Sequence, residues 1–128
     1  MQSGLNPAPG FQKNPGKRIT IEPYPGTVTV SLGDAVIASS KDAKLLREGD
    51  YPAIFYIPFK DIYFEHLEKT ASSTHCPYKG DASYWRVQAV GEAVDDAMWA
   101  YETPYDEMAL IREHGAFYPD KLRIEAGE

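Results

Sequence analysis

The chain has only one cysteine and no long apolar run, and each of these shortages excludes a class of protein. A single cysteine cannot form a disulfide within the chain, so we expect a reducing, cytoplasmic environment. The strongest apolar run, residues 53–57, is far shorter than the roughly 20 residues that a membrane-spanning helix needs. Residues 1–10 have neither the basic start nor the apolar stretch of a secretory signal. We therefore expect no association with a membrane.

Basic residues are also scarce. The chain has 13 Lys and Arg against 19 Asp and Glu, which gives a net charge of −6, and no basic run is longer than Lys17-Arg18. Proteins that bind nucleic acids present a basic face to the phosphate backbone. We therefore expect no nucleic-acid partner.

Proline and glycine cluster near the start of the chain, where Pro7, Pro9-Gly10 and Pro15-Gly16 follow one another closely. This pattern predicts an extended N-terminal arm over residues 1–18. The remaining residues, 19–128, are enough for one hydrophobic core. We therefore expect a single domain preceded by an arm.

Apolar and polar residues alternate in many of the segments that follow, and this period of two is typical of strands. Residues 27–32 and 35–38 flank Gly33-Asp34 and predict a β-hairpin. Residues 42–48 fit either a short helix or a strand. Further strands are predicted at residues 54–57, 62–67, 84–90, 97–101, 117–118 and 122–125. The sequence thus predicts a mainly β, compact, antiparallel domain.

One segment in the C-terminal half predicts a short helix. Thr103 is a typical N-cap residue, Pro104 suits the first helical position and Asp106 suits the third. Gly115 is a typical helix stop. The positive end of the helix dipole would then stabilise Asp106 and Glu107.

Residues 74–85 are the most informative stretch, because they contain the cysteine, one histidine, one lysine and three aromatic residues. Within them, Pro77 fixes the backbone after Cys76, and Gly80 permits an unusual turn after Lys79. A loop of this kind can hold polar groups against apolar ones, as a small-molecule site requires.

The run Cys-Pro-Tyr-Lys-Gly at residues 76–80, with Tyr84-Trp85 behind it, resembles the bacterial family called domain of unknown function 427. The resemblance also covers residues 6–10, 33–38, 56–58, 99–101 and 117–118. It implies a small, mostly β domain similar in shape to the β-tent fold, and it brings no known reaction.

A zinc site and a nucleotidyltransferase activity are two properties linked to such relatives, and the residues of this chain fit neither pattern well. The β-tent shape often holds zinc with two cysteine pairs, but one cysteine and three histidines fall short of that pattern, so we expect no metal and no other cofactor. The family is also labelled nucleotidyltransferase-like. That chemistry normally needs paired carboxylates on a strand to hold magnesium, whereas the acid-x-acid pair here, Glu48-Gly49-Asp50, lies in a predicted turn.

Cys76 and Lys79 are the candidate catalytic residues. A thiolate at Cys76 would be favoured by a cation such as Lys79, and the alternative is a small buried side chain that braces a tight loop. His75 is adjacent to Cys76, but neighbouring side chains in an extended segment point to opposite faces, so we expect no dyad. Lys79 beside Gly80 suits a carboxylate or phosphate group, and the alternative is a solvated lysine in a turn.

Aromatic residues from several predicted strands can form the wall of a pocket for a planar or cationic ligand, or can simply be core. The candidate ligand-binding residues are Tyr56, Tyr78, Lys79, Gly80, Tyr84, Trp99, Tyr101 and Tyr118.

Three interpretations of function follow from these residues. We expect a domain that binds a small anionic or aromatic molecule at the loop of residues 76–80, with or without catalysis of a reaction. A second interpretation is a non-catalytic module that associates with itself through an exposed sheet edge or the N-terminal arm. A third is a redox-sensing thiol at Cys76, which would need a resolving cysteine from another molecule. The nucleotidyltransferase label adds an enzymatic alternative.

Overall fold

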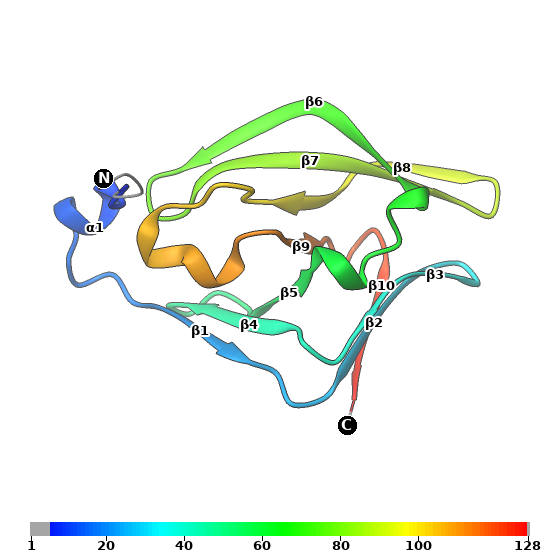
Figure 1. Cartoon of the computed structure of the whole chain (residues 1–128), viewed down its shortest axis with the longest axis horizontal. Helices are drawn as coiled ribbons and strands as arrows, with labels where there is room; N and C mark the ends of the chain where they lie inside the picture. The colour runs from blue at the N-terminus through cyan, green and yellow to red at the C-terminus, as the bar shows by residue number, and fades with distance from the viewer. Residues whose placement is uncertain (1–5, 128) are drawn as a thin grey trace.

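The computed structural model describes residues 6–127, and two antiparallel sheets form most of this region (Figure 1). Within these residues the larger sheet has seven strands, in the spatial order β1 (Ile19–Pro23), β4 (Lys44–Glu48), β5 (Ile54–Pro58), β9 (His114–Phe117), β8 (Glu92–Ala100), β7 (Gly80–Ala89) and β6 (Leu67–Cys76). The smaller sheet has three, in the order β10 (Arg123–Gly127), β2 (Thr27–Leu32) and β3 (Ala35–Ser40). The predicted mainly β, antiparallel domain is confirmed, and its β-tent name stays a prediction.

Figure 1 shows β6, β7 and β8 along one side of the molecule and β1, β4 and β5 along the other, with β9 between them. One hydrophobic cluster surrounds Val30, Ile57 and Met98, which come from both sheets. A second cluster surrounds Tyr56 and Ile111. The two sheets thus bury the apolar faces that a period of two creates.

The hairpin predicted around Gly33-Asp34 forms as β2 and β3. The prediction of a strand at residues 62–67 is wrong. Two 3₁₀ turns, η1 (Phe59–Asp61) and η2 (Phe64–His66), lead into β6, and between them Ile62 makes a single β-bridge to Ala38. The ambiguous residues 42–48 contain β4, which is a strand because it pairs with β1 on one edge and β5 on the other.

Residues 76–80 form the turn of a long hairpin. β6 and β7 pair from Leu67 opposite Val87 to Cys76 opposite Gly80, and the amide of Lys79 donates to the carbonyl of Cys76 at 3.2 Å. Gly80 has a φ of +123°, a conformation that residues with a Cβ rarely adopt. The sequence does not predict β6, because most of its side chains are polar and exposed at a sheet edge and show no apolar alternation.

The helix predicted between Thr103 and Gly115 is shorter and of another kind. It is a 3₁₀ segment, η3 (Asp106–Ile111), which begins after Tyr105 without a side-chain cap. Gly115 lies in β9, where an added Cβ would come within 2.6 Å of the sulfur of Met98. This glycine therefore leaves room for the buried side chain of Met98 from β8 and does not end a helix.

The N-terminal arm is not extended throughout, because it contains a one-turn helix, α1 (Pro9–Lys13). The arm lies against the body of the domain. Asp106 Oδ2 accepts a hydrogen bond from the amide of Asn6 at 2.6 Å, and Glu107 Oε1 accepts one from the amide of Ala8 at 2.9 Å. The two acids therefore bind the arm, a role that the helix-dipole interpretation did not foresee.

β5 and β9 are paired over a very short distance, at Ile57 with Gly115 and at Pro58 with His114. On its other edge, β5 continues to pair with β4, and β9 continues to pair with β8. The two halves of the large sheet therefore separate beyond Ile57. This separation positions the candidate site.

Candidate functional site

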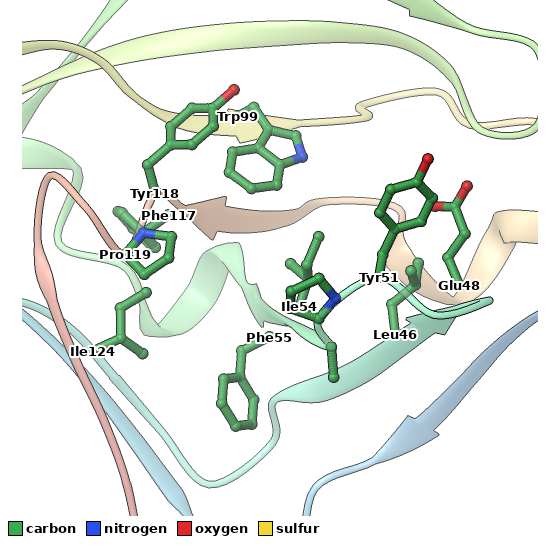
Figure 2. Close-up of a pocket in the computed structure, with 12 residues that line it drawn as sticks. Leu46, Glu48, Tyr51, Ile54, Phe55, Trp99, Phe117, Tyr118, Pro119 and Ile124 are labelled. Atoms are coloured by element: carbon green, nitrogen blue, oxygen red, sulfur yellow. The ribbon is translucent and has the colours of Figure 1, made fainter.

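A groove of about 690 Å³ opens where β5 and β9 separate (Figure 2). Most of its lining is apolar and consists of Leu46, Pro52, Ala53, Ile54, Phe55, Trp99, Phe117, Pro119 and Ile124. Polar atoms are added by Glu48, Tyr51 and Tyr118. A concave site of this size, with apolar walls and few polar groups, is typical of small-molecule binding.

Trp99 and Tyr118 form an aromatic wall on one side of the groove (Figure 2). Their ring centroids lie 4.4 Å apart, with the ring planes tilted by 43°. Behind them, Tyr56 is only 1% exposed and accepts a hydrogen bond from Trp99 Nε1 at 3.3 Å. Because Trp99 is fixed by a buried partner, this wall exists before any ligand binds.

Tyr118 also has a fixed protonation state. Burial, together with a hydrogen bond to Tyr84, raises the pKa of Tyr118 to about 12. The hydroxyl of Tyr84 lies 2.8 Å from Oγ1 of Thr74, which links this pair to β6. Tyr118 therefore keeps its proton at neutral pH, and its hydroxyl group points away from Ile54 and Phe55 on the opposite side of the groove (Figure 2).

Glu48 provides the charge at one end of the groove, beside Tyr51 (Figure 2). Its Oε1 accepts a hydrogen bond from Lys79 Nζ at 2.7 Å, and its Oε2 lies 3.0 Å from Lys17 Nζ. Burial by itself would raise the pKa of Glu48, but the hydrogen bonds from Lys79 and Lys17 outweigh burial and hold the pKa below its usual value. Glu48 is thus ionised at neutral pH, and two ammonium groups against one carboxylate leave one positive charge in excess.

The arm contributes to this end of the groove through Lys17. The ammonium of Lys17 lies over the rings of Tyr78, at 5.1 Å, and Tyr51, at 5.9 Å. These cation–π contacts add to the ion pair with Glu48. A residue of the predicted arm therefore completes the charged cluster of Glu48, Lys79 and Lys17.

The predicted site residues fall into three groups: those that line the groove, those that bind lining residues from behind, and those that do neither. Trp99 and Tyr118 line the groove. Tyr56, Tyr84 and Lys79 lie directly behind lining residues and bind them, as described above.

The other predicted site residues are not among those that line the groove. Tyr78 packs against Phe11 of the arm with ring centroids 5.0 Å apart. Gly80 is buried beside Pro104, and Tyr101 is 8% exposed in the second hydrophobic cluster. The structure thus moves the centre of the candidate site from the hairpin turn to the groove that Lys79 supports.

Cys76 is half-buried, and its sulfur lies 3.9 Å from the ammonium of Lys79. His75 has a separate partner, because its Nδ1 lies 2.8 Å from Oδ1 of Asp81. The thiol of Cys76 and the ring of His75 therefore have different partners, Lys79 and Asp81, as expected for side chains that alternate along a strand.

Glu48 and Lys17 are the charged groups of the site that the sequence did not indicate. Glu48 precedes a glycine turn and is 31 positions from Lys79, so its pairing depends on the fold. The sequence also did not indicate that Phe55 and Tyr51 line a groove, because aromatic residues near turns are common in β proteins. No local signal marks these residues as part of a groove.

Within the described residues, no group of three or more His, Cys, Asp or Glu side chains is arranged to hold a metal ion. Nor is there, in this same part of the chain, a helix with the length and apolar character needed to cross a membrane.

A comparison with protein-family models matches residues 20–128 to NTP_transf_9, described as a domain of unknown function, DUF427. The chain therefore belongs to the DUF427 family, as the Cys-Pro-Tyr-Lys-Gly run predicted. The matched region includes every residue that lines the groove and also Lys79, whereas Lys17 lies before it. A comparison with curated proteins finds no match.

Proposed function

We propose that this domain binds a small, planar, largely apolar molecule in the groove, with a hydrogen-bond donor of that molecule directed at Glu48. The observation that carries the proposal is the fixed aromatic wall of Trp99 and Tyr118 in a groove of about 690 Å³. Rings stack or meet edge to face with planar ligands, and burial of apolar area supplies most of the affinity.

The charged cluster supports a donor on the ligand. Each oxygen of Glu48 already receives one lysine, but a carboxylate has about four lone-pair positions. Lys79 and Lys17 keep this carboxylate ionised and orient it, and the excess positive charge tolerates an anionic substituent as well. Lys79 therefore acts through Glu48 in this proposal, and Cys76 has no catalytic step in it.

The proposal is tested by fluorescence titration with N-phenyl-1-naphthylamine, an apolar aromatic amine with a planar naphthyl ring system and an N–H donor, which becomes fluorescent in apolar sites. Tyr51→Ala removes a groove residue whose side chain is largely solvent-exposed, so this variant folds. Loss of its ring contact weakens binding by roughly fivefold. Tyr63→Ala is the matched control, since Tyr63 is also an exposed tyrosine but does not line the groove.

Trp99→Ala is a second variant and removes the larger of the two rings of the wall, so we expect a loss of affinity of roughly tenfold or more. Equal affinities of the Tyr51→Ala and Tyr63→Ala variants, or absence of fluorescence enhancement in the native protein, would overturn the proposal. A cytoplasmic location belongs to the same proposal and is supported by the single free cysteine.

The alternative of self-association gains no support from the arm. The arm binds its own domain through Asp106, Glu107 and the carbonyl of Pro77, which accepts from the amide of Gly10 at 2.9 Å. The arm thus has an intramolecular role, and a partner is not needed to explain it. The solution mass remains the measurement that tests this alternative.

A further inference from the structure

A second, smaller pocket lies at the other end of β4. Glu48 at the end of this strand borders the groove, whereas Lys44 at its start borders the second pocket, whose volume is about 410 Å³. Lys41, Lys60 and His114 also line it. Three lysines around one small pocket are unexpected in a chain whose net charge is −6.

Lys44 and His114 are positioned by strand pairing and by hydrogen bonds. They lie on β4 and β9, on either side of β5, and Lys44 Nζ is 3.1 Å from His114 Nε2. His114 Nδ1 is 2.8 Å from the carbonyl oxygen of Arg112. Because a carbonyl can only accept, Nδ1 carries the proton and Nε2 accepts from the ammonium. Since no other partner of Lys44 Nζ is found among residues 6–127, two of its three ammonium hydrogens are left for another acceptor.

The charges around the pocket do not cancel. Lys60 is neutralised by Asp42, at 2.7 Å, and Asp61, at 3.2 Å. Within residues 6–127, Lys44 and Lys41 form no salt bridge, and the one hydrogen bond of Lys44 goes to an uncharged imidazole. Three lysines line the pocket against one lining carboxylate, that of Asp42, while Asp61 and Glu113 lie outside the lining; the positive charge without an ion-pair partner among the described residues is on the side of Lys44 and Lys41.

We propose that this pocket binds a small oxyanion of the phosphate type, either inorganic phosphate or the phosphate group of a small metabolite. Lys44 is the principal ligand, because its ammonium is oriented by His114 and has free hydrogens. Lys41 adds a second charge from the turn before β4. An ammonium group recognises phosphate as a point charge through charge-assisted hydrogen bonds. The site is separate from the groove, and its occupancy does not depend on the function proposed there.

His114 makes binding at this site coupled to pH. Burial lowers the pKa of His114, the hydrogen bond to Arg112 opposes this effect, and the charge of Lys44 lowers the pKa further. The other charged groups around the ring are Lys41, Lys60, Asp42 and Glu113. An anion beside Lys44 cancels part of the repulsion between Lys44 and a protonated ring, so it raises the pKa of His114. By linkage, each charge state of the anion then binds more tightly to the protein whose His114 ring is protonated than to the protein whose ring is neutral.

The experiment is a pH titration of the histidine ring resonances by NMR, in inorganic phosphate and in sodium chloride of equal ionic strength. Phosphate is expected to raise the pKa of His114 by about half a pH unit or more, while the resonances of His66 and His75, which do not line the pocket, respond equally to both salts. Glycerol 3-phosphate and glycerol separate the two sources of the anion. Tighter binding of glycerol 3-phosphate than of phosphate assigns the site to a phosphorylated metabolite, and equal binding assigns it to the free anion.

Amino-acid substitutions test whether Lys44 and Lys41 bind the phosphate. Lys44→Gln is expected to weaken phosphate binding roughly tenfold, and Lys41→Gln, at an exposed position that the fold does not require, roughly threefold. Lys13→Gln makes the same change of charge on α1, outside the pocket, and is expected to bind as the native protein does. Equal affinities of the Lys41→Gln and Lys13→Gln variants would overturn the proposal. So would a His114 titration that phosphate and sodium chloride affect alike.

Discussion

The ammonium of Lys79 lies 2.7 Å from Oε1 of Glu48, and only 9% of the Lys79 side chain is exposed. This pair joins the turn between β6 and β7 to the end of β4, two places that are 31 residues apart in the chain. The lysine of the Cys-Pro-Tyr-Lys-Gly run therefore faces inward. Its nearest charged group is a carboxylate of the groove.

Removal of Lys79 is expected to be far more costly than removal of an exposed lysine with the same ion-pair distance. Lys79→Ala leaves the partly buried Glu48 with Lys17 as its remaining lysine partner, and we expect the free energy of unfolding to fall by about 3 kcal/mol. Lys69→Ala is the control, because Lys69 lies 2.7 Å from Glu102 but both side chains are exposed by 40% or more. Its loss should be below about 1 kcal/mol. Urea unfolding followed by tryptophan fluorescence measures both, and equal losses would contradict the prediction.

Acid is expected to remove the contribution of the Glu48 cluster. Burial favours a higher pKa for Glu48, but the lysine hydrogen bonds prevail and the pKa in the folded state is lowered. A glutamate in an unfolded chain has a pKa of about 4.3. The ionised carboxylate therefore stabilises the fold fully above that pH, and this stabilisation is lost as the pH falls through the lower folded-state value.

Glu48→Gln isolates this effect, since glutamine does not ionise. The gap in unfolding free energy between the native protein and Glu48→Gln should be widest near pH 7 and narrow below about pH 4. Urea unfolding at a series of pH values measures the gap. If it stays constant down to the acid transition, the ionisation of Glu48 is not what stabilises this end of β4.

Alkali is expected to weaken the fold through buried tyrosines. Burial raises the pKa of Tyr101, and nearby tyrosine and other acidic groups raise it further. In an unfolded chain a tyrosine ionises near about pH 10. The neutral Tyr101 therefore contributes stability that is complete below about pH 10 and is lost as the pH rises above it. Tyr101→Phe should show a shallower loss of stability between about pH 10 and 11 than the native protein, and identical slopes would refute the assignment.

Gly10 is expected to be necessary for docking of the arm. An added Cβ there would lie 2.8 Å from the ring of Tyr78 and 2.9 Å from the carbonyl oxygen of Pro77, so Gly10→Ala should displace the arm and separate Lys17 from Glu48. Overpacking of this kind costs about 1–2 kcal/mol. Hydrogen exchange of the Gly10 amide, or of alanine at that position, reports the displacement.

Gly16→Ala is the matched control within the same arm. The nearest atom to a Cβ at that position is Oδ1 of Asn14 at 3.9 Å, so the added methyl group meets ordinary contact distances. The arm should therefore stay docked in this variant. Equal exchange rates in the two variants would show that the fit of Gly10 against Tyr78 does not hold the arm.

The sequence predicted those parts of the fold whose signals are local. The alternation on either side of Gly33-Asp34 predicted β2 and β3, because a turn and its two flanking strands lie within a few residues. The cap signal at Thr103 failed for the opposite reason. The carboxylates of Asp106 and Glu107 are used by the arm, so the segment follows contacts with residues about 100 positions away instead of its own propensity.

For the candidate site, too, the sequence indicated residue types but not contacts between distant residues. Residue types alone indicated Trp99, Tyr118 and Lys79, because aromatic rings and a lysine beside a glycine are suited to ligands wherever they occur. They could not indicate that Lys79 meets Glu48, nor that Lys44 meets His114 from a strand 70 positions away.

By itself, then, the sequence determined the family, the β class and the residue types available for binding, since each of these follows from neighbours along the chain. The tertiary structure alone decided where β5 and β9 separate, and that separation creates the groove. It also decided which charges are paired and which are left free at the second pocket. The physical reason is that strand pairing and ion pairing are contacts between distant segments, and their energies depend on a burial that exists only after the sheets have assembled.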